Sequence, residues 1–172
     1  MLYMKDKKLK KFETFVQDDI ERGDYATYDN DAGEAWWGNL GAGCLIFCKS
    51  SKRFLIGHRS KYVNEANCWS NFGGKIDSNE NIEDAVKREF AEETKYNNTI
   101  ELIPAYVFKT RGFKYYNFLG IIENEFKPIL DWENDDYKWL NYIELVKIEP
   151  KHFGLKNLLN DNDTQKIINS LL

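Results

Sequence analysis

Residues 73–96 have the sequence GGKIDSNENIEDAVKREFAEETKY, which predicts a turn at the two glycines, a short polar loop and then a helix. Asn81 is suited to cap the start of that helix, with Asp84 following in a weak capping-box arrangement. Apolar residues then recur at helical spacing and predict one face that packs against a core. These apolar residues are Ile82, Ala85, Val86 and Phe90.

The second half of the same helix face carries acids in place of hydrocarbon. Because residues advance by about 100° around a helix, Glu89 and Glu93 project close to the centre of the apolar stripe, with Glu92 just beside it. Carboxylates this close repel one another unless they take up protons or bind a hard divalent cation. For an isolated cluster a solvated helix end is the more common interpretation. The upstream glycines and Glu80 favour a metal site instead.

Together these positions resemble the signature of the Nudix hydrolase family (MutT-like), G-x5-E-x7-R-E-U-x-E-E-x-G-U, where U is a bulky apolar residue. The chain supplies Gly74, Glu80 and the run REFAEET at 88–94. Lys95 replaces the last glycine, and Tyr96 follows at the apolar position. A lysine there suits the helix dipole but adopts the left-handed conformation less readily than glycine, so the geometry of the helix exit is left open.

The resemblance covers about residues 41–145, including CWSNFGGKID at 68–77, which is similar to the family's W-x-x-P-G-G-K-x-E segment. It implies one α/β domain over residues 1–172, with a mixed β-sheet sandwiched between helices. Residues 1–40 would form an N-terminal helix and loop extension, and residues 146–172 the C-terminal helices. The implied reaction is hydrolysis of the pyrophosphate bond in a nucleoside diphosphate linked to another group: an NTP, an NDP-sugar, ADP-ribose or a dinucleoside polyphosphate.

The resemblance also implies roles for individual residues, with Mg²⁺ as cofactor and Mn²⁺ as a substitute. Glu92 and Glu93 are the expected principal metal ligands, and Glu89 is either a third ligand or the base that activates water. The carbonyl of Gly73 is a further expected ligand. Arg88 would orient Glu89 through a charge-assisted hydrogen bond. The remaining expectations are that Glu80 braces the loop and that Arg59 and Lys75 bind substrate, although Arg59 could equally be a surface arginine that ends a strand.

Residues 131–141, DWENDDYKWLN, form a predicted acidic loop. A helix face cannot surround a cation, so we expect another ligand from a facing loop. The spacing to Tyr137 and Trp139 resembles the family and favours Glu133 for that role. Asp136 and a plain acidic surface loop are the alternatives.

Elsewhere, alternating apolar residues predict strands at 41–49, 53–59, 99–109 and 113–123. Helices are expected at 143–148 and 153–172, and an amphipathic helix at 5–22. The adjacent Trp36 and Trp37 could line a base-stacking site, a subunit contact or a packing surface. His58 and His152 are both expected to be structural.

Composition narrows the function classes. The 172 residues are 42% hydrophobic, which suffices for one core, and a net charge of −4 with a pI near 5.3 disfavours nucleic acid and anionic membranes as partners. No segment is long and apolar enough for a membrane helix, and the three cysteines match no zinc spacing, so we expect a reduced, cytoplasmic protein. The expected partner is a small nucleotide, with a homodimer possible. The alternative functions are a catalytically silent nucleotide sensor with a Nudix fold and an RNA-cap hydrolase.

Overall fold

The computed structural model describes residues 40–110 and 112–172. The helix expected at 5–22, together with Trp36 and Trp37, lies outside the described residues. Within the described residues, none of the helices is long and apolar enough to cross a membrane. The three cysteines are free and buried, in keeping with the expectation that they are reduced.

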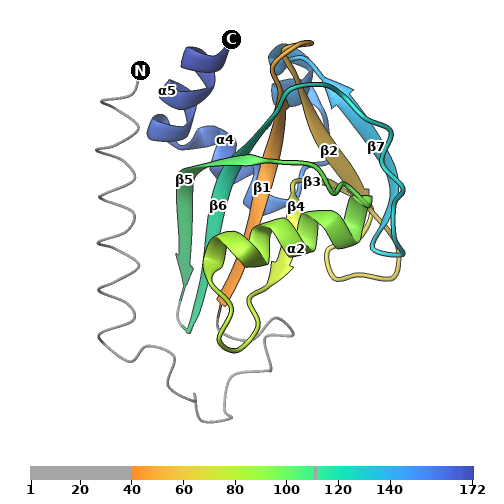
Figure 1. The fold of residues 1–172 in the computed structure, drawn as a ribbon, viewed down its shortest axis with the longest axis vertical. Coiled ribbons are helices and arrows are strands. Elements are labelled where there is room, and N and C mark those ends of the chain that lie inside the picture. The colour runs from red at the N-terminus through yellow and green to blue at the C-terminus, as the bar shows by residue number, and fades with distance from the viewer. Residues whose placement is uncertain (1–39, 111) are drawn as a thin grey trace.

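Within these residues, seven strands form one mixed β-sheet at the centre of the molecule (Figure 1). They are β1 (Leu40–Cys48), β2 (Arg53–Arg59), β3 (Trp69–Ser70), β4 (Phe72–Lys75), β5 (Glu101–Thr110), β6 (Phe113–Ile122) and β7 (Asn134–Leu140). The path through the sheet is β3-β2-β1-β6-β5, with β4 beside β1 and β7 beside β2. The four strands expected from alternation are therefore confirmed within one or two residues at their ends.

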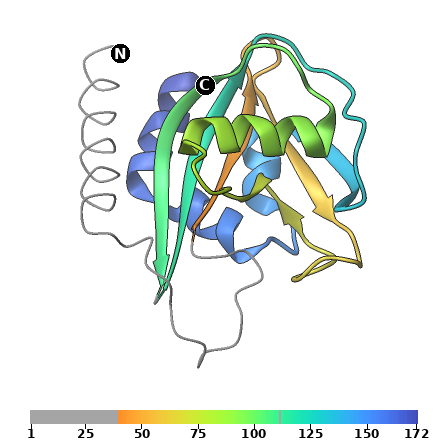
Figure 2. The ribbon, with the colours of Figure 1, turned by 60° about the horizontal axis from the view of Figure 1, so that its bottom comes forward.

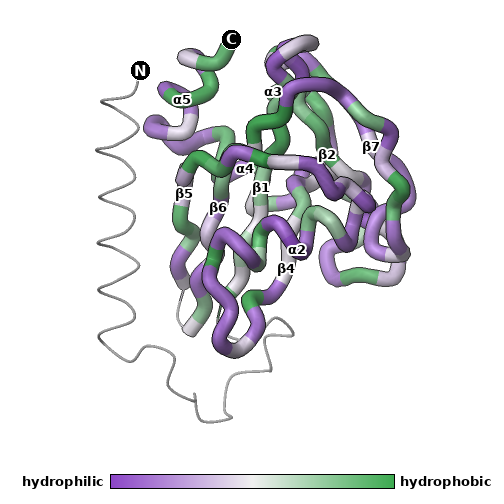
Figure 3. The backbone as a smooth tube through the Cα atoms, viewed as in Figure 1, coloured by the Kyte–Doolittle hydropathy of each residue, from purple (hydrophilic) through white to green (hydrophobic). Residues whose placement is uncertain are grey.

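The central strand is β1, which pairs in parallel with β6 and antiparallel with β2 and β4. Its residues from Gly41 to Cys48 are all buried, as expected for a strand covered on both faces. Ile46 and its alternate neighbours pack towards one helix layer, while Leu45 and Phe47 pack towards the other. Figure 3 shows hydrophobic residues on β1 and hydrophilic residues along much of α2.

Helices cover both faces of the sheet (Figure 2). The helix α2 (Ile82–Thr94) lies on one face, and buried leucine and isoleucine residues of the three C-terminal helices pack on the other. Those helices are α3 (Tyr142–Lys147), α4 (Phe153–Asn160) and α5 (Asn162–Leu171). The predicted α/β class, with a mixed sheet between helices, is confirmed.

Both ends of α2 have defined caps. The Asn81 side chain accepts a hydrogen bond from the Asp84 N–H at 2.9 Å, which confirms it as the N-cap. At the other end, Lys95 adopts the left-handed conformation (φ 59°, ψ 23°), and its ammonium donates to the Glu92 carbonyl at 2.9 Å. The chain therefore leaves the helix in the conformation that favours glycine, at a cost of about 1–2 kcal/mol for a residue with a side chain.

The glycine pair does not form the turn that the sequence suggested. Gly73 and Gly74 lie inside the short strand β4, opposite Gly43 and Ala42 of β1. Gly73 has φ +148°, and a Cβ added there would lie 2.4 Å from the Ala42 carbonyl oxygen. The glycine pair thus lets β4 approach β1 in a backbone conformation that other residues rarely adopt.

Two further expectations need correction. Residues 131–141 are not all loop, because residues 134–140 form β7 and pair antiparallel with β2. Residues 153–172 are not one helix, because the chain breaks at Asp161, whose carboxylate accepts from the Thr164 N–H at 2.8 Å and caps α5. Pairing with β2 orders residues 134–140 as a strand despite their acidic composition. The cap at Asp161 interrupts the helical periodicity of residues 153–172.

Candidate active site

The acids of α2 differ in burial according to their direction from the helix axis. Glu93 points into the protein and is 5% exposed, Glu89 is half-buried, and Glu92 is exposed. The expected change from hydrocarbon to carboxylate along one helix face is therefore present, but Glu92 lies at its edge. The two inward acids approach the strand β4 directly.

Glu93 has protein donors on both carboxylate oxygens. The Gly73 N–H donates to Oε2 at 2.7 Å, and the Asn134 side-chain amide donates to Oε1 at 2.9 Å. Burial raises the pKa of Glu93 well above its ordinary value and the charge of Glu133 raises it further, whereas the two hydrogen bonds lower it. Glu93 is thus held rigidly in a place where negative charge is costly.

Glu89 lies directly over Gly74. A Cβ added at Gly74 would lie 2.7 Å from the Glu89 carboxyl carbon and from both of its oxygens. Burial raises the pKa of Glu89, against the lowering effect of Arg88, and Glu92 adds a further increase. The absence of a side chain at residue 74 is what allows this carboxylate to rest on the β4 backbone.

Arg88 connects the other acids of the signature. Its Nε and Nη2 donate to the two oxygens of Glu80, both at 2.9 Å, and its Nη1 donates to Glu89 at 2.9 Å and to Glu92 at 3.4 Å. Nη2 also donates to the Lys75 carbonyl at 2.9 Å. The hydrogen bonds from Arg88 lower the pKa of Glu80. One guanidinium therefore joins Glu80 of the loop before α2 to two acids of the helix, Glu89 and Glu92.

Glu133 lies immediately before β7, and its backbone is fixed at both ends. Its N–H donates to the Asp131 carboxylate at 2.9 Å, and its carbonyl accepts from the Ser60 N–H at 2.8 Å. Burial raises the pKa of its half-buried carboxyl group, followed in effect by the charges of Asp131 and Glu89. Glu133 therefore lies close enough to the α2 acids for its charge to raise the pKa of Glu93 and for the charge of Glu89 to raise its own.

The signature acids and Glu133 offer oxygen atoms to a metal ion, but they do not yet surround one. No three His, Cys, Asp or Glu side chains among the described residues are arranged around a common ion position, and several of the acids are engaged by Arg88, Gly73 and Asn134. The donor set nevertheless consists of oxygen atoms, which Mg²⁺ prefers. Burial is the main cause that raises the pKa of three carboxyl groups, those of Glu89, Glu93 and Glu133, and the charge of neighbouring acids raises each further. A divalent cation would relieve that repulsion, so the residues fit such an ion chemically.

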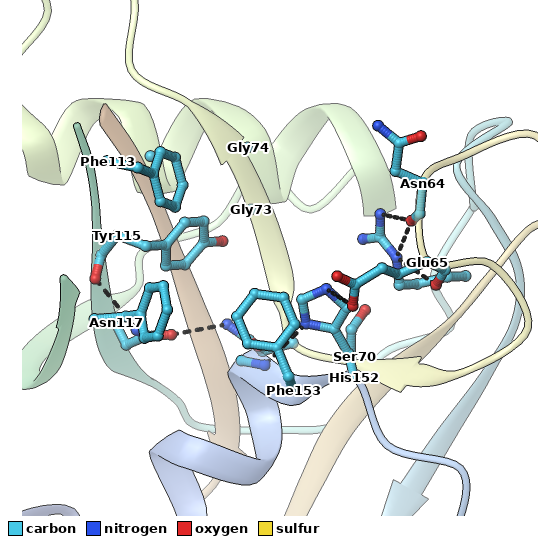
Figure 4. Close-up of a pocket in the computed structure, with 15 residues that line it drawn as sticks. Asn64, Glu65, Ser70, Gly73, Gly74, Phe113, Tyr115, Asn117, His152 and Phe153 are labelled. Carbon is cyan, nitrogen blue, oxygen red and sulfur yellow. Dashed lines mark hydrogen bonds and ion pairs between the residues drawn. The ribbon is translucent and has the colours of Figure 1, made fainter. Parts of the chain in front are cut away.

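A cavity of about 210 Å³ opens on the other side of β4 (Figure 4). Figure 4 shows the rings of Phe113, Tyr115 and Phe153 beside Gly73 and Gly74. The ring of Phe108 lies 5.5 Å from that of Phe153, measured between centroids. The residues that line the cavity are Gly41, Arg59, Asn64, Glu65, Ser70, Asn71, Gly73, Gly74, Phe108, Phe113, Tyr115, Asn117, His152, Phe153 and Gly154.

Of the two predicted substrate-binding cations, the structure places only Arg59 at the cavity. Its Nε and Nη2 donate to the Asn64 carbonyl at 3.2 and 2.7 Å, and Nε also lies 3.3 Å from the Glu65 carbonyl. The side chain of Lys75 is exposed and does not line the cavity; the residue meets Arg88 through its carbonyl. The expectation for Lys75 therefore has no support from the lining of the cavity.

His152 borders the same cavity at the start of α4. Its Nδ1 accepts from the Gly154 N–H at 3.1 Å, and its Nε2 lies 3.0 Å from the Glu65 carboxylate. Burial, with a smaller contribution from Arg59, lowers the pKa of His152 to about 4. The ring is therefore neutral at pH 7 and donates its Nε2 proton to Glu65. This helix-capping contact fits the structural part expected for His152.

Sequence reasoning missed Asn134 and the cavity. Asn134 follows Glu133 directly, but its contact with Glu93 spans 41 positions, and no local pattern indicates it. The aromatic alternation around Tyr115 was visible in the sequence, whereas the contribution of Phe153 from a distant helix was not.

A family model described as NUDIX domain matches residues 39–161. The chain belongs to the Nudix family. The match extends past residue 145, where the resemblance of the motifs ended, and takes in α4. Membership of the Nudix family is consistent with the expected pyrophosphohydrolase activity. None of the curated protein sequences compared with it matches this Nudix chain.

Solved structures resemble this Nudix domain in fold. A MutT Nudix hydrolase from Burkholderia pseudomallei has a TM-score of 0.56 and 23% identity, over 73% of this chain and 98% of that one. An Ap4A hydrolase from C. elegans, solved as a binary complex, has a TM-score of 0.57 and 22% identity, over 76% and 97%. The Nudix domain of Shewanella oneidensis NrtR, complexed with ADP ribose, has a TM-score of 0.59 and 21% identity, over 85% and 95%.

Proposed function

We propose that this protein hydrolyses the pyrophosphate bond of a nucleoside diphosphate linked to another group, with Mg²⁺ as cofactor and Mn²⁺ as a substitute. The observation that carries the proposal is the position of the glycine pair. Gly73 contacts Glu93, Gly74 carries Glu89 above it, and both glycines also line the aromatic cavity. A nucleotide with its base in the cavity would therefore have its phosphates beside the carboxylates.

The proposed metal ligands all offer oxygen, as Mg²⁺ prefers. When bound, a divalent cation neutralises pyrophosphate oxygens and lowers the pKa of a coordinated water. The proposed ligands are the Gly73 carbonyl, Glu89, Glu92, Glu93 and Glu133.

The chain's own groups supply proton transfer and orientation. Glu89 is half-buried and its pKa is raised, which brings it closer to the pH at which a general base works best. Glu89 therefore serves either as a ligand or as the base that takes a proton from water. Arg88 orients Glu89 through its Nη1, and Glu80 orients Arg88. Glu80 is thus a positioning residue in this proposal.

Substrate binding would use the aromatic cavity and Arg59. The faces of Phe113 and Tyr115 can stack on a nucleobase, and the amides of Asn71 and Asn117 offer both donors and acceptors to its edge. The Nη1 of Arg59 has no hydrogen-bond partner among the described residues, whereas Nε and Nη2 are bonded to loop carbonyls. This nitrogen is available to a substrate phosphate.

The two alternative functions have less support. A silent nucleotide sensor would not need the complete set of signature acids that this chain retains. An RNA-cap hydrolase would need a basic path for RNA, and the net charge of −4 disfavours one. A homodimer and a cytoplasmic location stay predictions from the sequence.

The proposal is tested with a panel of NTPs, NDP-sugars, ADP-ribose and dinucleoside polyphosphates, incubated with Mg²⁺ and assayed for nucleotide, phosphate and pyrophosphate products. We expect turnover of at least one class, loss of that turnover in EDTA, and recovery with Mn²⁺. Tight binding of a nucleotide without any turnover would instead indicate the sensor. The Glu89→Gln variant serves as the matched inactive control, because it keeps the shape of the side chain.

A further inference from the structure

We propose that a β-bulge at Asp135, fastened by His58, makes Asn134 the positioning residue for Glu93. The link to cation binding rests on the function proposed above. The bulge itself lies in the pairing between β2 and β7, and Asn134 beside it faces the side of the sheet where Glu93 is buried.

The bulge is visible in the register of the two strands. Gly57 pairs with Tyr137 and His58 with Asp136, but the next residue, Arg59, pairs with Asn134. One step along β2 thus corresponds to two steps along β7, and Asp135 is the extra residue. An extra residue in one strand shifts every later side chain to the opposite face.

That shift decides which side chain reaches α2. Trp139 and Tyr137 pack in the cluster that contains Phe90 of α2, so strict alternation would place Asp135 on the same face and Asn134 on the other. In the structure the assignments are reversed. Asn134 donates to Glu93 of α2, and Asp135 pairs with His58 on the opposite face. Without the bulge, a carboxylate would face Glu93 in place of an amide.

His58 fastens the bulge from the opposite face. Its Nδ1 lies 2.6 Å from the Asp135 carboxylate, and its ring packs against Trp69, 4.8 Å away between centroids. Trp69 belongs to the core cluster beneath the C-terminal helices. The ring of His58 therefore has a fixed place from which it can hold Asp135 out of the α2 face.

Gly57 provides the space for the Asn134 side chain. A Cβ added at Gly57 would lie 2.5 Å from the Oδ1 of Asn134 and 3.0 Å from its Cγ. Asn134 and Glu93 are each only 5% exposed, so water does not compete for their hydrogen bond. The Asn134 side chain can therefore occupy this position only because residue 57 is a glycine.

The consequence for Glu93 is a fixed carboxylate plane. Asn134 occupies one oxygen and the Gly73 N–H the other, and each oxygen keeps a second lone pair. A ligand held in this way meets a cation without first losing rotamer freedom. Asn134 thus acts on the cation only through Glu93, which it orients, and has no proposed contact with substrate.

The experiment compares the full-length wild type with Asn134→Ala, Gly57→Ala and His58→Phe. His58→Phe keeps a ring against Trp69 and removes Nδ1. Two quantities are measured: the Glu93 side-chain carboxyl resonance by NMR without metal, and Mn²⁺ affinity by electron paramagnetic resonance. Asp136→Ala is the matched control, because the Asp136 carboxylate accepts a hydrogen bond from the neighbouring Tyr137 N–H and from no other group in residues 40–110 and 112–172.

We expect the Glu93 resonance to shift in all three variants and not in the control. Mn²⁺ affinity should fall about 10–100-fold in Asn134→Ala, in the range for residues behind a metal ligand, and in the same direction in the other two variants. An unchanged Glu93 resonance in His58→Phe, or unchanged Mn²⁺ affinity in Asn134→Ala, would overturn this inference and leave the proposed function standing. A wild type that binds no Mn²⁺ would overturn the proposed metal site, and the positioning of Glu93 would then be decided by the resonance.

Discussion

Arg88 binds Glu80 through two parallel hydrogen bonds, from Nε to Oε1 and from Nη2 to Oε2, each 2.9 Å long. Arg88 therefore makes its bidentate contact with Glu80 in the loop before α2, and its Nη1 donates to Glu89. Because a guanidinium is planar, fixing two of its nitrogens on Glu80 also fixes the direction of the third. The position of Glu89 thus depends on Glu80, which does not contact it.

The first prediction concerns Arg88→Lys. A lysine keeps the charge but cannot bind both oxygens of Glu80 while reaching Glu89. We expect a loss of about 1.5–3 kcal/mol in the free energy of unfolding, measured by urea denaturation. Turnover should fall about 10–100-fold, as for groups that orient a ligand. Wild-type activity in this variant would show that the orientation of Glu89 is not important.

The second prediction concerns Glu93→Gln. The change keeps the side-chain shape and removes the charge of the proposed ligand, so kcat should fall by more than about 100-fold, the upper end for residues that act behind a ligand. Circular dichroism spectra should match those of the wild type. Near wild-type turnover would contradict the assignment of Glu93.

The third prediction concerns pH and Mg²⁺. The pKa values of Glu89, Glu93 and Glu133 are raised in the folded protein, so their stabilising contribution is present below the ordinary carboxyl pKa and is lost as pH rises through the raised values. The three groups should thus make the metal-free protein less stable at pH 8 than at pH 5. Mg²⁺ binds the ionised acids, so it should raise the melting temperature more at pH 8.

Melting curves in EDTA and in millimolar Mg²⁺ at the two pH values check this. Glu93→Gln is the control, and its Mg²⁺-induced shift in melting temperature should differ less between pH 5 and pH 8 than that of the wild type. Equal shifts at pH 5 and pH 8, or none at either, would argue against a cation at these carboxylates.

The fourth prediction concerns Glu133→Ala. Glu133 faces the α2 acids electrostatically, so its loss should lower turnover and raise the Mg²⁺ concentration needed for half-maximal activity. The effect should be far larger than that of Asp136→Ala, with Asp135→Ala in between because it loosens the bulge. If Asp136→Ala is the most damaging change, Asp136 supplies the distal carboxylate instead.

The fifth prediction concerns Lys95→Gly. Relief of the left-handed conformation is worth about 1–2 kcal/mol, and the extra freedom of glycine in the unfolded chain offsets about 0.5–1 kcal/mol. The variant should therefore be more stable by about 0.5–1 kcal/mol in urea denaturation. Lys87→Gly, inside the same helix, should instead be destabilising by about 1 kcal/mol. A destabilised Lys95→Gly variant would mean that the Lys95 ammonium contributes more than the strain costs.

Elements with local signals could be predicted from the amino-acid sequence. The helix at 82–94, its Asn81 cap and the strands at 40–48 and 53–59 follow from periodicity and capping, which act between residues close in the chain. The signature acids could be placed on one helix face for the same reason. The fold class followed, because the same motif spacing identified the family that the sheet and helices then matched.

The contacts that hold those acids depend on residues far apart in the chain and could not be predicted in this way. The hydrogen bond from Asn134 to Glu93 exists because one extra residue in β7 changes the face of the strand, and register between distant strands has no local sequence signal. The cavity likewise needs Phe153 from α4 beside Tyr115 from β6. Packing of the whole sheet and its helices brings such groups together, so pattern reading within single segments could not find them.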